Sequence, residues 1–381
     1  MKELGIYIHI PFCKKKCNYC DFISYSNKDE FILKYIEILK KEIERSVKLT
    51  NSEEYIVKTI YIGGGTPSFI NSESIIEILK KIREKYIIDK DVEITIEVNP
   101  GTVTEQKLCD YYNSGINRLS IGLQSDNDEI LKTIGRIHTY SEFLNTYKLA
   151  RKVGFKNINV DLMLALPNQT VEILENTVNR VVKLNPEHIS IYSLIIEEGT
   201  KLEKQISSGE LTLPDENTER IMYHLVRKVL NENEYIQYEI SNYSKIGFQS
   251  KHNTDCWSQK EYIGFGVAAH SYINMERFSN ITKIEEYIEN IENDNIENNY
   301  IINEKQNKIS QMKEYMMLGL RKIKGVSITE FEQKFNQNPI YLYRIELNKL
   351  VNEELLEVDG DNIKLTIKGL DFANLVWEEF I

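Results

Sequence analysis

The sequence predicts an α/β protein: an open barrel of six βα units followed by a smaller α+β module. Three observations support this prediction. Six short apolar segments recur within the first two hundred residues, segments with helical periodicity separate them, and the pattern changes near residue 213. Apolar strands that alternate with helices are typical of parallel βα folds. Because a closed barrel of this type needs eight units, six units predict an open, TIM-like partial barrel.

The expected strands are GIYIHIPF (5–12), TIYIGGG (59–65), VEITIEVNP (92–100), RLSIGLQS (118–125), INVDLMLALP (158–167) and HISIYSLII (188–196). Their nearly continuous apolar character favours strands that are buried on both faces. Helices are expected between them, including 29–47 and 72–86, with Asn71 and Ser72 as candidate caps of the second. Polar residues and glycines follow the strands, at the rim where βα folds bind ligands.

The chain has a different organisation after residue 213. A helix is expected at 215–233, followed by the segment 238–245 and a polar and aromatic stretch at 251–273. Residues 281–310 are rich in Asn, Glu and Ile, which predicts a helix followed by a linker. We therefore expect the partial barrel at 1–212 and an extension of the barrel at 213–300.

The last segment, 301–381, is predicted to form a winged-helix-like domain. Helices are expected at 308–323, 328–335 and 340–352, before two short strands at 355–358 and 363–367 and a final helix from Lys368. Asp359 to Asn362 supply the turn between the strands. Because the module has no clear basic recognition face, we expect a structural or protein-contacting role rather than DNA binding.

Composition excludes several classes of protein. Hydrophobic residues make up 41% of the 381 residues, which is enough for a large core and does not fit a disordered chain. The net charge of −11, from 47 basic and 58 acidic residues, argues against a nucleic-acid-binding protein. No apolar run has the length of a membrane span, and the N-terminus lacks the features of a signal peptide. A cytoplasmic location is therefore expected.

Three of the five cysteines, Cys13, Cys17 and Cys20, lie within eight residues directly after the first strand. In a reducing compartment such a group is typical of a metal or redox site rather than of disulfides. Three thiolates can hold three corners of a [4Fe–4S] cluster, which leaves the fourth iron open to the amino and carboxylate groups of S-adenosylmethionine. Zinc, with His9 as a fourth ligand, is the alternative, although C-x3-C-x2-C differs from the usual CxxC zinc pairs.

A glycine-rich motif, Gly63-Gly64-Gly65-Thr66-Pro67, follows the second strand, and its glycines allow the backbone to approach a ligand closely. Such a motif is weak evidence alone, but after the cysteine motif it indicates where backbone carbonyls bind the amino group of adenosylmethionine. Polar side chains also stand near the ends of three other strands, namely Glu97, Gln124 and Asp161. Each is compatible with an ordinary helix cap, whereas their repeated placement on one rim favours a shared ligand.

Together these motifs resemble the oxygen-independent coproporphyrinogen III oxidase family of radical S-adenosylmethionine (radical SAM) proteins. The resemblance covers essentially the whole chain and includes Tyr7-Ile-His9-Ile-Pro-Phe-Cys13, the cysteine cluster, GGGTP, Glu97-Val-Asn-Pro, Leu119-Ser-Ile-Gly-Leu-Gln124 and Asp161-Leu-Met-Leu-Ala-Leu-Pro167. It implies a first adenosylmethionine site at Tyr7, Gly64 and Glu97. It implies a second site at Gly65, Thr66, Gln124, Arg136 and Asp161. Tyr19 matches an aromatic residue between two cluster cysteines.

Two departures from the oxidases resemble the heme chaperone branch of the family. The oxidases carry a further cysteine two residues after the cluster, where this chain has Phe22. They also have a longer segment before the Tyr-x-His motif, whereas Tyr7 nearly begins this chain. The chaperone branch has an HNxxYW motif, and here the stretch is His252-Asn253-Thr-Asp-Cys256-Trp257. The His, Asn and Trp are present, but Cys256 replaces the tyrosine.

The HNxxxW stretch is also chemically suited to heme. An imidazole such as that of His252 is a common axial ligand of heme iron, and Trp257 offers a flat apolar partner for a porphyrin. Cys256 adds a soft sulfur, as a second ligand or a thioether site. The alternative is that His252 and Trp257 are ordinary packing residues. His270 is a second candidate ligand.

The leading hypothesis is therefore a heme chaperone that binds heme, a [4Fe–4S] cluster and S-adenosylmethionine, and delivers heme to an acceptor protein such as a respiratory hemoprotein. The cluster is then a redox or dimerisation switch, and net coproporphyrinogen dehydrogenase activity is not expected. The alternative is a coproporphyrinogen III oxidase, which decarboxylates two propionates by radical chemistry, and a third hypothesis is radical chemistry on another substrate. An electron donor for the cluster is implied. A homodimer and contact with a membrane surface stay open.

Overall fold

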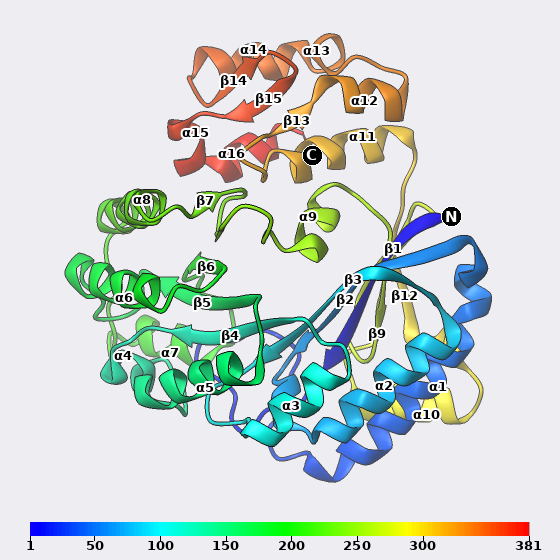
Figure 1. The fold of residues 1–381 in the computed structure, drawn as a ribbon. Coiled ribbons are helices and arrows are strands. Elements are labelled where there is room, and N and C mark those ends of the chain that lie inside the picture. The colour runs from blue at the N-terminus through cyan, green and yellow to red at the C-terminus, as the bar shows by residue number, and fades with distance from the viewer. Residues whose placement is uncertain (381) are drawn as a thin grey trace.

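In the computed structural model, which describes residues 1–380, a twelve-stranded sheet forms the body of the protein (Figure 1). Its central strands are parallel and lie in sequence order: β1 (Lys2–Ile10), β2 (Tyr55–Gly64), β3 (Ile87–Val98), β4 (Arg118–Gln124), β5 (Ile158–Leu164) and β6 (His188–Ser193). The intervening helices are α1 (Ile32–Thr50), α2 (Ser72–Lys85), α3 (Glu105–Asn113), α4 (Asp128–Thr133), α5 (Tyr140–Val153) and α6 (Val171–Leu184). The predicted βα array is confirmed. Asn71 caps α2, because its side chain accepts a hydrogen bond from the Ser74 N–H.

The sheet of residues 1–380 is open, which confirms the partial barrel. β6 pairs on its outer side with the antiparallel strand β8 (Asn242–Ser244), and β8 pairs with β7 (Ile236–Gln237). β1 pairs on its other side with the parallel strand β9 (Tyr262–Phe265). The antiparallel strands β10 (His270–Ile273), β11 (Glu276–Asn280) and β12 (Tyr300–Lys305) complete that edge.

The prediction of a linker within 281–310 was wrong. Helix α10 (Ile284–Glu292) is present, but the residues after it include β12, which pairs with β11 along Glu276–Asn280. Most of β12 is exposed, and it is the last strand of the sheet. An edge strand of this kind has no buried face to impose an apolar pattern, so composition alone did not predict it.

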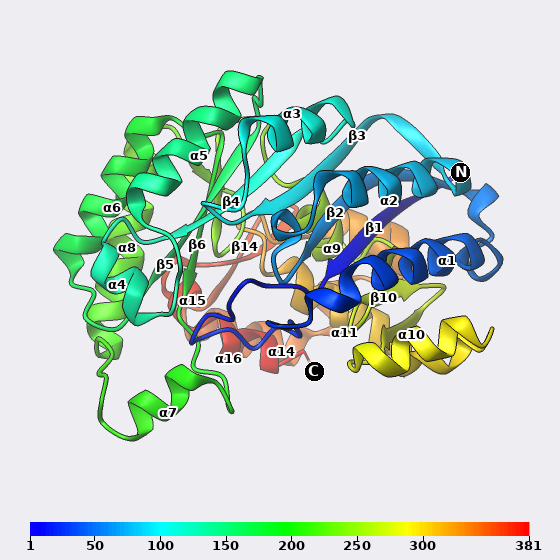
Figure 2. The same cartoon turned by 90° about the horizontal axis from the view of Figure 1, so that it is seen from below.

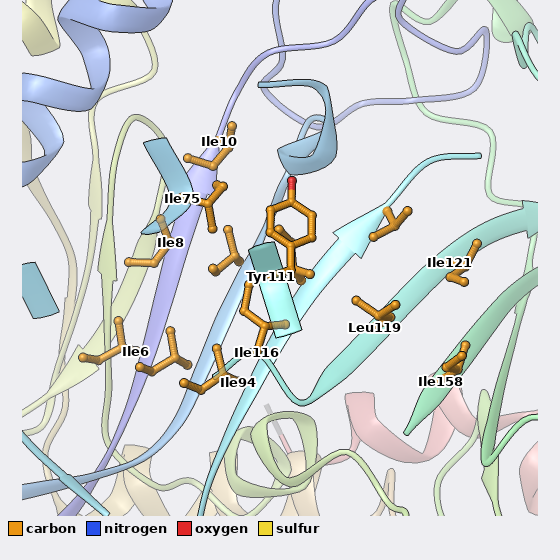
Figure 3. Packing of buried hydrophobic residues seen from close by; sticks show 14 of the residues in the cluster. Ile6, Ile8, Ile10, Ile75, Ile94, Tyr111, Ile116, Leu119, Ile121 and Ile158 are labelled. Carbon is orange, nitrogen blue, oxygen red and sulfur yellow. The ribbon is translucent and has the colours of Figure 1, made fainter. Parts of the chain in front are cut away.

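The two faces of the parallel strands differ in chemistry. Side chains such as Ile8, Ile94 and Leu119 point toward helices α2 and α3 and form the main apolar core (Figure 3). Side chains at the alternate positions line what we call the inner face: Gly5, Tyr7, His9, Thr59, Tyr61, Gly63, Glu93, Thr95, Glu97, Arg118, Ser120, Gly122, Asn159, Asp161, His188, Ser190 and Tyr192. The strands are covered on both sides, as predicted, but the inner side is polar. The barrel therefore presents its polar side chains to a ligand rather than filling its interior with apolar ones.

The C-terminal part has its own three-stranded sheet and its own apolar cluster around Phe331. It consists of α11 (Lys308–Gly319), β13 (Val326–Ser327), α12 (Ile328–Phe335), α13 (Pro339–Leu342), α14 (Arg344–Asn352), β14 (Leu356–Asp359), β15 (Asn362–Leu365), α15 (Ile367–Asp371) and α16 (Ala373–Glu378). Helices α11 and α12 and a divided third helix (α13 and α14) precede the hairpin of β14 and β15, which matches the predicted winged-helix-like module. The expected helix at 340–352 is divided at Tyr343 into α13 and α14.

The C-terminal module lies beside the amino-terminal ends of the barrel strands, with α9 (Lys251–Trp257) between the module and the sheet (Figure 1). Helix α7 (Lys201–Ser207) and helix α8 (Glu216–Glu232) connect β6 to this region. Figure 2 shows the opposite end, where the carboxyl ends of the strands and the loop after β1 face the viewer. Among the described helices, none combines the length and the apolar character that crossing a membrane requires.

Candidate functional site

The loop after β1 carries the three clustered cysteines and is fixed at both ends. The Cys13 N–H donates to the Tyr25 carbonyl at 2.9 Å, and the Tyr25 N–H donates to the Pro11 carbonyl at 2.6 Å. Farther along, the Asn18 N–H donates to the carbonyl of Ile134, just after α4, at 2.9 Å. These bonds hold the cysteine-bearing backbone against the barrel without help from a disulfide, since all three thiols are free.

The thiols face hydrogen-bond donors from neighbouring strands and loops. Thr66 Oγ1 donates to Cys13 Sγ at 3.4 Å, and Arg136 Nη1 donates to Cys17 Sγ at 3.6 Å. Burial, together with the nearby Cys17, raises the pKa of Cys20 to about 11. Thiolates in this position therefore need positive charge, which bound iron supplies, because metal binding displaces the thiol proton.

The arrangement does not suit a single metal ion. No three His, Cys, Asp or Glu side chains of the described residues converge as a mononuclear site requires. The expected fourth zinc ligand, His9, is also engaged: Nε2 is bonded to the Ile23 carbonyl at 2.8 Å and Nδ1 to the Tyr7 hydroxyl at 3.0 Å. In a [4Fe–4S] cluster each thiolate binds a different iron, so the three sulfurs are spaced around the cluster and do not converge on one ion. With both His9 nitrogens engaged, the loop offers three thiols, which is the number that a [4Fe–4S] cluster with one open iron takes.

The glycine triplet brings the end of β2 against the cysteine loop. Gly64 has φ +112°, and a Cβ there would lie 2.7 Å from the His9 ring. A Cβ on Gly65 would lie 3.0 Å from Cys13 Sγ and from backbone atoms of the preceding loop. A side chain at either position would push the two loops apart, which explains the glycines without invoking a ligand and also leaves the backbone accessible to one.

Glu97, at the end of β3, connects the glycine motif to a row of aromatic rings. Its carboxylate accepts from the Gly64 N–H at 3.2 Å and from the Tyr61 hydroxyl at 3.0 Å. Tyr61 in turn stacks on Tyr7, with 6.3 Å between ring centroids. Burial and the nearby Asp161 raise the pKa of Glu97 to about 7. Tyr61 was not among the predicted site residues; its inner-facing position in β2, two residues before Gly63, was the available signal.

Arg136 joins the second group of predicted residues through Asn99. Its guanidinium donates to Asn99 Oδ1 at 2.6 Å and to the Gly122 carbonyl at 2.7 Å. Asn99 Nδ2 donates to Thr66 Oγ1 at 2.8 Å, which completes a chain of hydrogen bonds to Cys13. Sequence analysis missed Asn99 as a site residue, although it stands two residues after Glu97 on the same rim. A pocket at this point is lined by Lys14, Lys15, Cys17, Thr66, Asn99, Thr102, Gly135, Arg136, Ile137 and His138.

The remaining predicted rim residues lie on neighbouring elements. Gln124 ends β4 in the left-handed conformation, at φ +71°, beside Gly122. Asp161 accepts hydrogen bonds from Ser120 Oγ at 3.0 Å and from Asn159 Nδ2 at 2.8 Å. Tyr19 packs against the small apolar cluster that includes Leu131 and Leu202.

His252 lies at the other end of the barrel. It stands in α9, where its Nδ1 is 2.8 Å from Thr59 Oγ1 and its ring stacks on Tyr61 at 5.3 Å between centroids. Thr59 and Gly64 are five residues apart on β2, about 16 Å along a strand. The structure therefore brings the cysteines, Glu97 and Arg136 together at the rim. His252 meets this group from the amino-terminal half of β2 through the ring of Tyr61, which also stacks on Tyr7 and donates to Glu97.

Trp257 takes part in the contact with the C-terminal module. Its ring is covered by the Arg321 guanidinium, 4.4 Å from the ring centroid, and the same guanidinium lies 4.6 Å from Trp377 in α16. Trp257 thus holds the C-terminal module in place instead of presenting that face to a porphyrin. Cys256 is partly buried beside Tyr262 and Arg277, and burial raises its pKa to about 12. His270 is exposed in β10.

Comparison with known proteins identifies the fold and the family. Residues 7–181 match the radical SAM superfamily, and residues 306–372 match the HemN C-terminal domain. Among solved structures, coproporphyrinogen III oxidase (HemN) of Escherichia coli has a TM-score of 0.86 and 22% identity, covering 100% of this chain and 90% of that one. The fold and the cysteine loop thus define a radical SAM protein.

Sequence relatives narrow the assignment further. The heme chaperone HemW of Lactococcus lactis is 36% identical over 100% of this chain and 98% of its own, and that of Bacillus subtilis is 35% identical over 98% of each. The Escherichia coli heme chaperone HemW is 39% identical over 72% of this chain and 71% of its own. The chain belongs to the heme chaperone HemW family.

Proposed function

We propose that this protein is a heme chaperone that holds a [4Fe–4S] cluster with S-adenosylmethionine, binds heme and passes it to an acceptor protein. The observation that carries the proposal is the likeness to heme chaperone HemW proteins over the full length of the chain. The acceptor, for which a respiratory hemoprotein is one chemical class, and the electron donor of the cluster are further partners. We place the protein in the cytoplasm and divide it into a barrel at 1–212, an extension at 213–300 and a C-terminal domain at 301–381.

Cys13, Cys17 and Cys20 are the residues that would hold the cluster. When bound with adenosylmethionine, the cluster supplies an electron to the sulfonium group. Glu97, beside Gly64 and Tyr7, provides negative charge for the cationic cofactor at the first site. The second site would consist of Gly65, Thr66, Gln124, Arg136 and Asp161, with Tyr19 next to the cluster. The hydrogen-bonded row Arg136–Asn99–Thr66 supports this grouping because it fixes Arg136 beside Cys17.

His252 is our candidate for the axial heme ligand. Burial, followed by the charge of Arg118, lowers its pKa to about 4, so the imidazole is neutral at physiological pH. Nδ1 is occupied by Thr59, and an imidazole that donates from Nδ1 has its lone pair on Nε2, the form that binds iron. Thr59 would then act as the outer partner that orients the ligand. Cys256 and His270 are the competing candidates.

A heme titration distinguishes these candidates. The variants are His252→Ala, Cys256→Ser and His270→Ala, each with folding checked by circular dichroism. His252→Ala is expected to weaken heme binding at least tenfold and to shift the Soret band, while the other two retain both. Unchanged affinity and an unchanged Soret band in His252→Ala would assign the ligand elsewhere, with His270 next.

Coproporphyrinogen III oxidation is the second candidate function, because the oxidase shares the fold. One experiment separates the two functions. The cluster is reconstituted anaerobically, and the same preparation is assayed for heme binding and for decarboxylation of coproporphyrinogen III. We expect heme binding without catalytic formation of protoporphyrinogen. Repeated turnover to protoporphyrinogen would replace the chaperone proposal by the oxidase.

A further inference from the structure

Arg118 is a buried cation on the inner face of the barrel. It is the first residue of β4, and only 2% of its surface is exposed. Across the sheet it is in register with Thr95 of β3, which is in register with Tyr61 of β2. This row lies at the amino-terminal part of β4, whereas Gln124 ends the same strand six positions later, about 20 Å away. Arg118 is therefore at the end of the barrel where α9 carries His252.

The Arg118 guanidinium lacks a partner of its own. Within residues 1–380 it makes no side-chain hydrogen bond or ion pair, and its Nε is fully buried without an acceptor. The Thr95 hydroxyl, in the adjacent register position, is also buried without a partner. Arg151 shows the usual arrangement, because it pairs with Glu187 at 2.8 Å. A buried charge without a partner costs several kcal/mol, so a retained arginine of this kind points to an acceptor that binds there.

The groups that face Arg118 do not supply that acceptor. Its charge acts on Asp161, His188, Tyr238, Tyr61 and His252, since it lowers the pKa of each beneath the value that burial alone would give. Asp161 is hydrogen-bonded by Ser120 and Asn159. The other carboxylates near these groups are also engaged elsewhere. Glu93 accepts from the backbone N–H groups of Lys251 and His252, Glu97 from Gly64 and Tyr61, and Glu239 from Ser241 and Asn242.

We propose that Arg118 binds a carboxylate of the ligand that enters the barrel, and that this carboxylate is a heme propionate. The inference rests on the proposed heme-binding function. A planar guanidinium binds a carboxylate through two parallel hydrogen bonds. The candidate iron ligand His252 and Arg118 flank the same tyrosine, Tyr61, so one tetrapyrrole would meet both. On the inner face Tyr192 is 40% exposed, and Tyr7 and Tyr61 are partly exposed.

The methionyl carboxylate of adenosylmethionine is the other source of the same chemistry. Its expected position is at the cluster, and Tyr7 of that first site shares the register row of Arg118 through Tyr61 and Thr95. The contact of His252 with the ring of Tyr61 favours the propionate, and the experiment includes a separate arm for each source.

The test compares heme with its dimethyl ester, in which both propionates lack charge. Wild-type protein is expected to bind heme roughly ten- to a hundredfold more tightly than the ester, and Arg118→Gln to bind both with the weaker affinity. Arg83→Gln, at an exposed arginine of α2, is the matched control and keeps the preference. Arg118→Lys retains the charge without the planar fork, and we expect an intermediate preference. In the second arm, binding of adenosylmethionine and of its decarboxylated analogue is unchanged by Arg118→Gln.

The outcomes separate this inference from the function on which it rests. If wild-type protein binds no heme, the proposed function fails. If it binds heme and the ester equally, or if Arg118→Gln keeps the preference, only the role of Arg118 fails. Loss of adenosylmethionine binding with unchanged heme binding would assign the carboxylate to that cofactor instead. Should Arg118→Gln not fold, Arg118→Lys decides: full heme preference in that variant contradicts bidentate recognition, and a reduced preference supports it.

Discussion

The two ends of the barrel are built on different principles. At the carboxyl end, the site residues follow or end single strands and contact each other through short hydrogen bonds, as Arg136, Asn99 and Thr66 do. At the amino end, His252 of α9 contacts Thr59 of β2, 193 positions earlier, and α11 of the C-terminal module packs against α9 (Figure 1). Local sequence motifs can identify the residues of the carboxyl end. The contacts of the amino end cannot be identified in this way, because α9 is far from β2 in the sequence.

The difference also concerns how each end is closed. The cysteine loop at the rim is partly accessible and offers free thiols. At the amino end, α9 lies between the sheet and the C-terminal module, and the Arg321 guanidinium lies over the rings of Trp257 and Trp377 (Figure 1). We therefore expect a ligand that reaches His252 along the inner face to enter from the rim. Three predictions test this contrast, beginning with the largest expected effect.

At the rim, removal of one cluster cysteine should abolish the cluster. Cys13, Cys17 and Cys20 form a set of three thiolates with no spare ligand on the loop. Replacing any of them with Ala is expected to eliminate the brown visible absorbance after anaerobic reconstitution.

Cys109→Ala is the matched control, because Cys109 lies in α3, away from the loop after β1. It should reconstitute like wild type. A full [4Fe–4S] spectrum from Cys17→Ala would show that the cysteine motif is not the ligand set, and the contrast between the two ends would lose its chemical basis.

The rim should also be the pH-sensitive end for cofactor binding. The pKa of Glu97 is about 7, so this carboxyl is largely neutral below pH 7 and ionised above it. Adenosylmethionine is cationic and is attracted by the ionised form. Its affinity should therefore rise up to about tenfold between pH 6 and pH 8, measured by equilibrium binding. Glu97→Gln is expected to bind weakly with no such dependence. The same pH dependence in Glu97→Gln would assign the titration to another group.

At the amino end, removal of the Arg321 side chain should loosen the C-terminal module. Two cation–π contacts are lost, which together contribute about 1–3 kcal/mol. Trp257 and Trp377 are the two tryptophans of the chain, so intrinsic fluorescence reports directly on this contact. Arg321→Ala is expected to shift the emission to the red and to lower the unfolding temperature. Arg344→Ala, at an exposed position of the same module, should change neither; an unshifted emission in Arg321→Ala would mean that the module is held by other contacts.

Much of the architecture could be predicted because local chemistry determines it. Strand positions followed from apolar runs, and the Asn71 cap followed from its place before α2. The cysteine spacing indicated its chemistry because a cluster loop is a contiguous piece of chain. Family resemblance, confirmed by the relatives, added the heme chaperone assignment.

The parts that could not be predicted depend on contacts across long separations or on a single alternate position. The polar inner face was not recognised in the sequence, because Ile60 and Ile62 alternate with Thr59, Tyr61 and Gly63 and make the segment look apolar throughout. Nothing in the sequence around Trp257 indicated that Arg321, 64 positions later, covers its ring. Strand β12 was not predicted, because a strand at an exposed edge of a sheet needs no apolar pattern in its sequence.

The position of β1 has a consequence for the order of assembly. This strand is made first, yet it lies in the middle of the sheet, between β2 and β9, and its Gly5 is in register with Tyr262. Synthesis must therefore proceed through Phe265 before both edges of β1 can be paired. The loop that carries the cysteines is attached to the end of this strand, so its final shape waits for the second half of the chain. Iron and sulfide should thus be loaded only after the chain has been made through Phe265, and not onto the first segment to leave the ribosome.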